Sequence, residues 1–98
     1  MDITKEKEGT KLTLTVTGRL DTTTSPELEK CISQSIDGIS DLLFDFTSLE
    51  YISSAGLRVL LSTQKKMNKQ GNMKVCHVNK EVYEIFEVTG FSDFLNIE

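Results

Sequence analysis

The chain has 98 residues, of which 38% are hydrophobic and 27% are charged, and its formal net charge at pH 7 is −4. This length and balance favour one soluble globular domain over residues 1–98 and exclude a strongly charged disordered chain. An acidic chain without a basic patch is a poor binder of nucleic acid, because phosphate contacts supply most of that affinity.

The first two predicted elements are strands. Residues 11–17 alternate apolar and polar side chains, a period of two that buries one face of a strand and exposes the other. Residues 3–7 form a weaker strand, and Glu8-Gly9 between the two is a plausible tight turn. The chain is therefore expected to open with an antiparallel hairpin.

A helix is predicted next, from about Pro26 to Ile36. Ser25 is a favourable N-cap, and proline suits the first helical position because it lacks the N–H that would be unpaired there. Asp37-Gly38 is expected to end the helix, since glycine can adopt the left-handed exit conformation. The apolar face of this helix consists of Leu28, Cys31, Ile32 and Ile36.

The central part of the chain predicts a strand, a polar turn and a longer helix. The short, nearly continuous apolar run 42–46 is typical of a strand buried on both faces. A helix then begins at Ser53 or Ser54 and runs to about Gln70, where Gly71-Asn72 breaks it. Its buried stripe is expected to contain Leu57, Leu60, Leu61 and Met67.

The C-terminal part predicts one more strand, residues 73–78, and one more helix, residues 80–88. Asn79 can cap this helix and Gly90 can end it. The segment 91–97 is apolar enough to pack back on the domain.

This order of elements defines the expected fold class, which is α/β. Alternating strands and helices favour parallel crossovers, so we predict a mixed, mostly parallel sheet with an N-terminal antiparallel hairpin and helices covering mainly one face. The residues that we expect to share one core are Leu14, Val16, Phe44, Leu60 and Ile85.

The sequence gives no indication of export or of a membrane span. Met1 is followed by a polar run up to Gly9, and no apolar stretch approaches the roughly 20 residues that a bilayer requires. We therefore expect a cytoplasmic protein without membrane insertion. Cys31 and Cys76 lack the spacing of a metal or redox motif, and both are predicted to be buried and reduced.

An enzyme is not expected. The single histidine, His77, lies inside a predicted strand, where it is more often a packing or surface residue than a catalyst. No phosphate-binding loop, dinucleotide fingerprint or metal-ligand spacing is present, so we expect no cofactor and no metal. A small enzyme that uses Ser54 as a nucleophile stays an alternative, but it lacks an evident base.

The most informative segment is 45–61, DFTSLEYISSAGLRVLL. It runs from the end of a buried strand through a polar turn into a helix that starts with two serines, and one serine would suffice as an N-cap. Gly56 in the first turn permits close approach by another backbone. Arg58, four residues after Ser54, can reach that serine along the helix, which suits a phosphate or a partner carboxylate; a solvated charge is the other interpretation.

This segment resembles the signature of STAS domains in anti-sigma factor antagonists. The matching parts are Asp45-Phe46-Thr47, Tyr51-Ile52-Ser53-Ser54-Ala55-Gly56-Leu57-Arg58, and an upstream turn, Gly18-Arg19-Leu20-Asp21. The resemblance extends over essentially the whole chain in length and in element order.

The resemblance implies a non-catalytic switch. Such proteins, when unphosphorylated, bind an anti-sigma factor, often a serine kinase, and so release the sigma factor; a metal-dependent serine phosphatase reverses the phosphorylation. The matching phosphorylated serine is Ser54, with Asp21 near it. The residues expected to bind the partner are Asp21, Thr22, Ser53, Ser54, Gly56 and Arg58.

Two alternatives follow from the same resemblance. Many members have aspartate before the phosphorylated serine, and this chain has Ser53 there, so Ser53 is an alternative phosphorylation site. STAS domains also serve as constitutive adaptor subunits, for example in lipid-transport complexes at the membrane, and in such a protein Ser54 would be only a helix cap.

Overall fold

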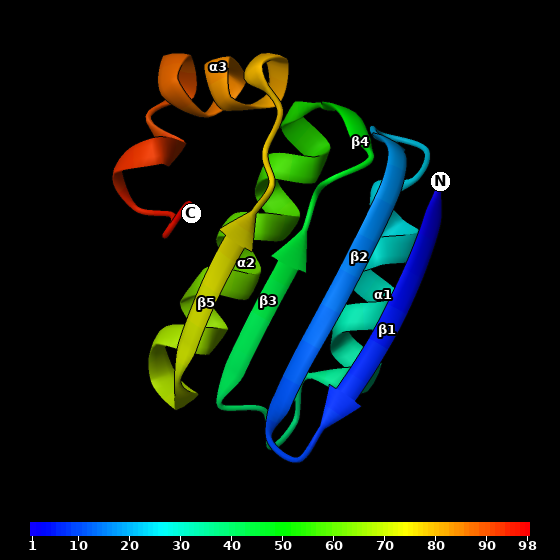
Figure 1. The fold of residues 1–98 in the computed structure, drawn as a ribbon, viewed down its shortest axis with the longest axis vertical. Coiled ribbons are helices and arrows are strands. Elements are labelled where there is room, and N and C mark those ends of the chain that lie inside the picture. The colour runs from blue at the N-terminus through cyan, green and yellow to red at the C-terminus, as the bar shows by residue number, and fades with distance from the viewer.

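Five strands form one mixed sheet in the computed structural model, which describes residues 1–98 (Figure 1). The elements in chain order are β1 (Asp2–Glu8), β2 (Lys11–Leu20), α1 (Ser25–Ser35), β3 (Asp41–Asp45), β4 (Leu49–Ile52), α2 (Ser54–Gln70), β5 (Asn72–Cys76), α3 (Lys80–Thr89) and a 3-10 turn at Phe91–Asp93.

The pairing of the strands confirms the predicted mixed sheet. β1 and β2 form the antiparallel hairpin, in which Glu8 pairs with Lys11 across the turn. β3 lies parallel to β2 and β5 lies parallel to β3, giving the order β1-β2-β3-β5, while β4 pairs with the far end of β2. The parallel pairs are each joined through a helix, as right-handed crossovers require.

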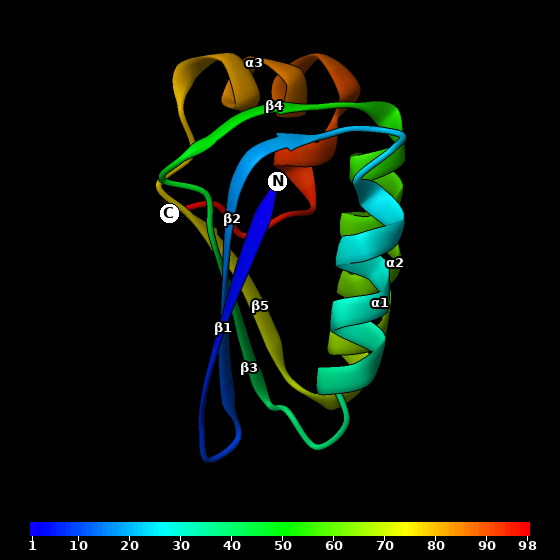
Figure 2. The same ribbon diagram turned by 90° about the vertical axis from the view of Figure 1, so that its right-hand side faces the viewer.

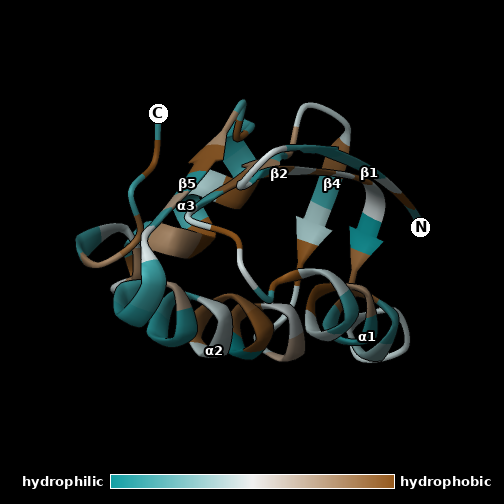
Figure 3. Ribbon diagram, turned by 90° about the horizontal axis from the view of Figure 1, so that it is seen from below, coloured by the Kyte–Doolittle hydropathy of each residue, from teal (hydrophilic) through white to brown (hydrophobic).

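Two helices cover one face of this sheet, which confirms the predicted one-sided cover. α1 and α2 lie side by side behind the strands in Figure 1, and the turned view in Figure 2 shows both on the same side. Figure 3 shows the sheet and the helix pair as two layers. The hydrophobic core, to which α3 also contributes, contains 22 buried apolar residues, including Leu14, Val16, Phe44 and Leu60, with Ile85 partly buried against them.

One-sided cover corrects the prediction that residues 42–46 are buried on both faces. Leu42 and Phe44 face the helices and are buried, whereas Leu43 and Asp45 on the opposite face are only half-buried. Two other predicted core residues, Cys31 and Leu61, are half-buried for a related reason, because they lie at the rim of their helix faces.

The strand β4 lies where the sequence predicts a polar turn, between the strand that ends at residue 46 and the helix that begins at Ser53 or Ser54. Leu49 and Ile52 are buried while Glu50 between them is exposed. The strand has only four residues, which are too few for a period of two to be recognised in the sequence. β4 forms because β2 is long: after Thr15 the strand β2 leaves β3, bends at a bulge between Gly18 and Arg19, and pairs with β4.

The start of α1 also differs from the prediction. Ser25 is the first helical residue, not the N-cap, and Pro26 takes the second position. Thr24 occupies the cap position without a side-chain capping bond. The hydroxyl of Ser25 is buried and donates to the carbonyl oxygen of Asp21, which fixes the loop before the helix.

The C-terminal third is close to the prediction except at His77. β5 ends at Cys76, and His77 has a left-handed φ of 59°, so it lies in a bend beyond the strand and is exposed. Asn79 caps α3 and Gly90 ends it with φ of 82°, as predicted. The tail packs back on the sheet, where Ile97 bridges to Val75. None of the helices is long and apolar enough to cross a membrane.

Candidate functional site

The pairing of β2 with β4 positions the candidate site. The ladder ends at the pair Leu20–Ile52, and the N–H of Ser53 then donates to the carbonyl oxygen of Leu20 over 2.9 Å. The two strands therefore end side by side. Asp21 begins a loop after β2, and Ser53 is the N-cap of α2 after β4. As a result, the loop that starts at Asp21 lies beside the first turn of α2.

The two serines at the start of α2 have different environments. Ser53 is the N-cap with extended backbone, but its side chain makes no capping bond and its Oγ is buried without a hydrogen-bond partner. Ser54 is the first helical residue and is exposed. The first intrahelical bond runs from the N–H of Leu57 to the carbonyl of Ser53, which leaves earlier N–H groups of the turn without intrahelical acceptors.

Asp21 organises its own loop. Its Oδ1 accepts from the N–H groups of Thr23 at 3.0 Å and Thr24 at 3.1 Å, while the Oγ1 of Thr24 accepts from the N–H of Asp21 at 2.9 Å. These bonds, led by the one from the Thr24 N–H, hold the pKa of Asp21 below its ordinary value, and the nearby Arg19 acts in the same direction. Arg19 itself lies over the ring of Tyr51, 4.5 Å from its centroid.

A shallow hollow of about 220 Å³ separates this loop from α2. Exposed Thr22 lies on one side and exposed Arg58 on the other, and Glu29 of α1 contributes a negative charge to the same hollow. Arg58 makes no salt bridge, so its guanidinium is available to a ligand or partner.

Gly56 has a different contact from the one expected. It is buried, and the close approach it permits is to side chains rather than to another backbone: a Cβ here would lie 2.8 Å from both Ile52 Cγ1 and Leu20 Cγ. Gly56 thus lets the first turn of α2 pack directly on the β2–β4 pair.

The predicted site residues are gathered around this one junction. Asp21 and Thr22 come from the loop after β2, and Ser53, Ser54, Gly56 and Arg58 come from the start of α2. No hydrogen bond joins Ser54 to Asp21, whose carboxylate is engaged within its own loop.

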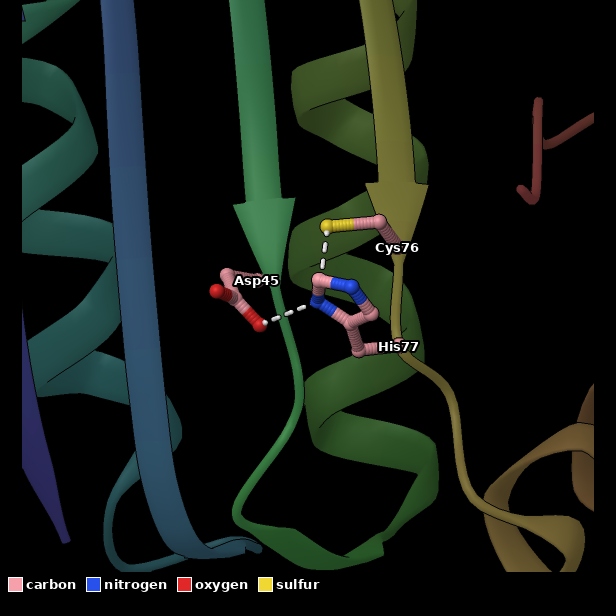
Figure 4. Close-up of side chains that lie close together, drawn as sticks. All are labelled: Asp45, Cys76 and His77. Atoms are coloured by element: carbon pink, nitrogen blue, oxygen red, sulfur yellow. Dashed lines mark hydrogen bonds and ion pairs between the residues drawn. The ribbon is translucent and has the colours of Figure 1, made fainter.

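The structure contains a second cluster, of three potential metal ligands, where the sequence predicts no metal site. Asp45, Cys76 and His77 meet at the carboxyl edge of β3 and β5, although Cys76 comes 31 positions after Asp45 in the chain (Figure 4). Bonds from the Thr47 hydroxyl and N–H, together with His77, lower the pKa of Asp45, whereas burial and the charges of Asp45 and Glu98 raise the pKa of the Cys76 thiol. Only the parallel register, Asp45 opposite Cys76, could have indicated this cluster.

A fold with an N-terminal hairpin, parallel strands and a serine-led α2 packed beside the β2 loop is that of a STAS domain. The family profile of the STAS domain matches residues 2–98, and the chain belongs to this family.

Its relatives in sequence are named as anti-sigma factor antagonists. The chain is 33% identical over 93 residues to BtrV of Bordetella bronchiseptica, an alignment that covers 93% of this chain and 80% of that protein. It is 30% identical over 84 residues to the anti-sigma-B factor antagonist of Staphylococcus aureus, covering 84% and 78%.

Solved structures share the fold over nearly the whole chain. An anti-sigma factor antagonist from Mycobacterium paratuberculosis superposes with a TM-score of 0.89 at 24% identity, covering 98% of this chain and 83% of that one. The antagonist SpoIIAA in its unphosphorylated form has a TM-score of 0.85 at 16% identity, covering 99% and 88%. The Bacillus protein SpoIIAA has also been solved in a phosphorylated form.

Proposed function

We propose that this protein is an anti-sigma factor antagonist whose binding to its anti-sigma factor ends when Ser54 is phosphorylated. The observation that carries the proposal is the position of Ser54: an exposed hydroxyl on the first residue of α2, beside the Asp21 loop and one turn before the unpaired Arg58. Relatives that are at least 30% identical and are named as anti-sigma-B factor antagonists support the choice of partner.

Burial favours Ser54 over Ser53 as the modified residue. A kinase must bring the serine oxygen into line with a phosphate donor, and this requires an accessible hydroxyl. The Oγ of Ser53 is buried, whereas Ser54 is exposed. The proposed switch is therefore Ser54, and Ser53 is assigned to the backbone turn that starts the helix.

A phosphate at Ser54 is compatible with the fold and unfavourable for a docked partner. It would add about −1.5 to −2 charges at neutral pH, which the N-terminal end of a helix dipole and its unpaired N–H groups stabilise. A partner that covers Ser54 would instead have to desolvate this charge. A binding loss of about 3 kcal/mol would raise the Kd by about two orders of magnitude.

The proposed role is that of a binding protein rather than an enzyme. Its partners are an anti-sigma factor, which would also be the serine kinase, and a serine phosphatase that restores the unphosphorylated form. Thr22 and Arg58, on the two sides of the hollow beside Ser54, are the exposed side chains that we assign to the contact surface, together with Ser54.

The test is a titration of the purified chain against its anti-sigma factor, with thermal unfolding measured in parallel. Ser54→Asp should weaken binding at least ten-fold and leave the fold intact, because aspartate is favoured in the first turn of a helix. Ser54→Ala should bind like the parent but resist phosphorylation. Its stability should lie within about 0.5 kcal/mol of the parent, since Ser54 is exposed and is not the N-cap of α2.

Ser62→Asp is the matched control, because Ser62 is an exposed serine on the same helix. It introduces the same charge two turns away and should leave the Kd unchanged. If Ser54→Asp and the phosphorylated parent both bind as tightly as the unmodified protein, Ser54 is not the switch. A constitutive adaptor role would then account for the fold.

A further inference from the structure

Three potential metal ligands converge on the sheet face opposite α1 and α2. His77 Nδ1 lies 3.1 Å from Asp45 Oδ1 and 3.5 Å from Cys76 Sγ, and the three ligand atoms all lie within 4.8 Å of one another (Figure 4). None of these residues belongs to the Ser54 site. We propose that Asp45, Cys76 and His77 form a binding site for Zn²⁺.

The spacing around His77 Nδ1 fits a tetrahedral ion. With Zn–S near 2.3 Å and Zn–N or Zn–O near 2.0–2.2 Å, neighbouring ligand atoms are about 3.4–3.6 Å apart. The two distances at His77 Nδ1 lie within a few tenths of an ångström of this spacing, and the ligand atoms of Asp45 and Cys76 lie within 4.8 Å of each other, so side-chain rotation has to bring them into position. Three protein ligands leave a fourth position for water or for a side chain of another molecule.

The donor set selects against other roles for the cluster. A thiolate with an imidazole is a soft combination that favours Zn²⁺ over Mg²⁺ or Ca²⁺. A Cys–His–Asp nucleophilic triad needs the two ring nitrogens to face different partners. Here Nδ1 faces both Cys76 and Asp45, and convergence on one point is what a shared ion requires.

The backbone holds the ligands in place. Asp45 and Cys76 are opposite each other in the β3–β5 ladder, and the Phe46 N–H continues this pairing with a 3.0 Å bond to the Cys76 carbonyl. The left-handed φ of His77 turns the ring back toward them.

The Asp45 carboxylate is also oriented from outside the cluster. The Thr47 N–H and hydroxyl donate to its Oδ1 at 3.0 and 2.6 Å, which holds in place the carboxylate oxygen that faces His77. On binding, Zn²⁺ would replace the thiol proton of Cys76, which passes to solvent, and the imidazole would bind as its neutral form.

The test uses Co²⁺ and Zn²⁺ alone, added to the full chain after treatment with a chelator. The parent should give a thiolate-to-cobalt charge-transfer band that Zn²⁺ abolishes. Cys76→Ser should lose the band, while Cys31→Ser, which removes the other cysteine, should keep it. His77→Asn should weaken Zn²⁺ binding at least ten-fold, and asparagine tolerates the left-handed backbone at this position.

The His77→Asn variant keeps the proposal testable even if Cys76→Ser fails to fold, because His77 is exposed and lies outside the strand. Its folded state is checked by circular dichroism. A parent without the charge-transfer band, or a His77→Asn variant that binds Zn²⁺ as tightly as the parent, would overturn the site. Either result would leave the Ser54 proposal unaffected, because binding to the anti-sigma factor is measured separately.

Discussion

At the scale of single residues, neighbours in the sequence have unrelated roles because of the direction each side chain takes. Ser53 is turned inward and Ser54 outward, and two residues later Gly56 is in contact with Leu20 and Ile52. The serine pair and the glycine form one motif in the sequence, but only Ser54 of the three residues is exposed. The motif therefore combines a packing requirement with the modification site that we propose.

Gly71 gives a stability prediction at this scale. A Cβ at this position would lie 1.9 Å from the carbonyl oxygen of Ser40, and that oxygen is fixed by the N–H of Asn72 at 2.8 Å. Gly71→Ala should therefore lower the free energy of unfolding by about 3 kcal/mol or more, because backbone rather than a flexible side chain must move. Urea unfolding measures the change.

Gly38→Ala is the control for this prediction. Gly38 has φ of 80° but open space around its Cβ position, so alanine there has only the conformational cost of about 1–2 kcal/mol. Equal losses in the two variants would show that the contact with Ser40 is not the cause.

At the scale of elements, one side chain joins α3 to β4. Asn79 accepts from the Val82 N–H at 2.8 Å through Oδ1, which caps the helix, and its Nδ2 donates to the Leu49 carbonyl at 2.8 Å. The short strand β4 has few ladder bonds of its own, and α3 lies against it at the carboxyl edge of the sheet (Figure 1). The cap and the tertiary contact thus depend on the same residue.

Asn79→Ala should destabilise the protein by about 1–2 kcal/mol, since it removes a cap and leaves a carbonyl group without its partner. Thermal unfolding tests this. Asn68→Ala on the exposed face of α2, where a single surface bond to Gln64 is lost, should change stability by no more than about 0.5 kcal/mol. Similar effects in the two variants would contradict the double role of Asn79.

At the scale of the whole molecule, two aspartates make the free energy of unfolding depend on pH. The folded-state pKa of both Asp21 and Asp45 is lowered, chiefly by the bonds from Thr24 and from Thr47. The unfolded chain therefore binds protons more readily, and these groups contribute stability at pH values above the unfolded pKa of about 3.9. That contribution is lost as the pH falls through the lower folded-state values.

We accordingly expect the contribution of these two groups to the free energy of unfolding to stay nearly constant from pH 7 to about pH 5. It should decrease once the pH is lower than about 4. Asp45→Asn keeps an acceptor for the Thr47 N–H but cannot titrate, so its stability should fall less between pH 5 and pH 3 than that of the parent. Urea unfolding at each pH is the measurement. An identical decrease in parent and variant would rule out Asp45 as a source of the dependence.

The sequence alone determined most of the elements and limited the candidate phosphorylation site to Ser54, with Ser53 as the alternative. Residues 11–17, the helix that starts at Ser53 or Ser54, and the cap at Asn79 were predictable, because local period and capping chemistry involve residues within a few positions of each other. The family signature, for the same reason, is read from one continuous segment.

Only the tertiary structure decided what happens where distant segments meet. β4 exists because β2 is long enough to bend away from β3, and that pairing places the Asp21 loop beside Ser54. The grouping of Asp45 with Cys76 and His77 follows from the parallel register of β3 and β5. The physical reason is the same in both cases: strand pairing joins residues about 30 positions apart, and no local pattern specifies that register.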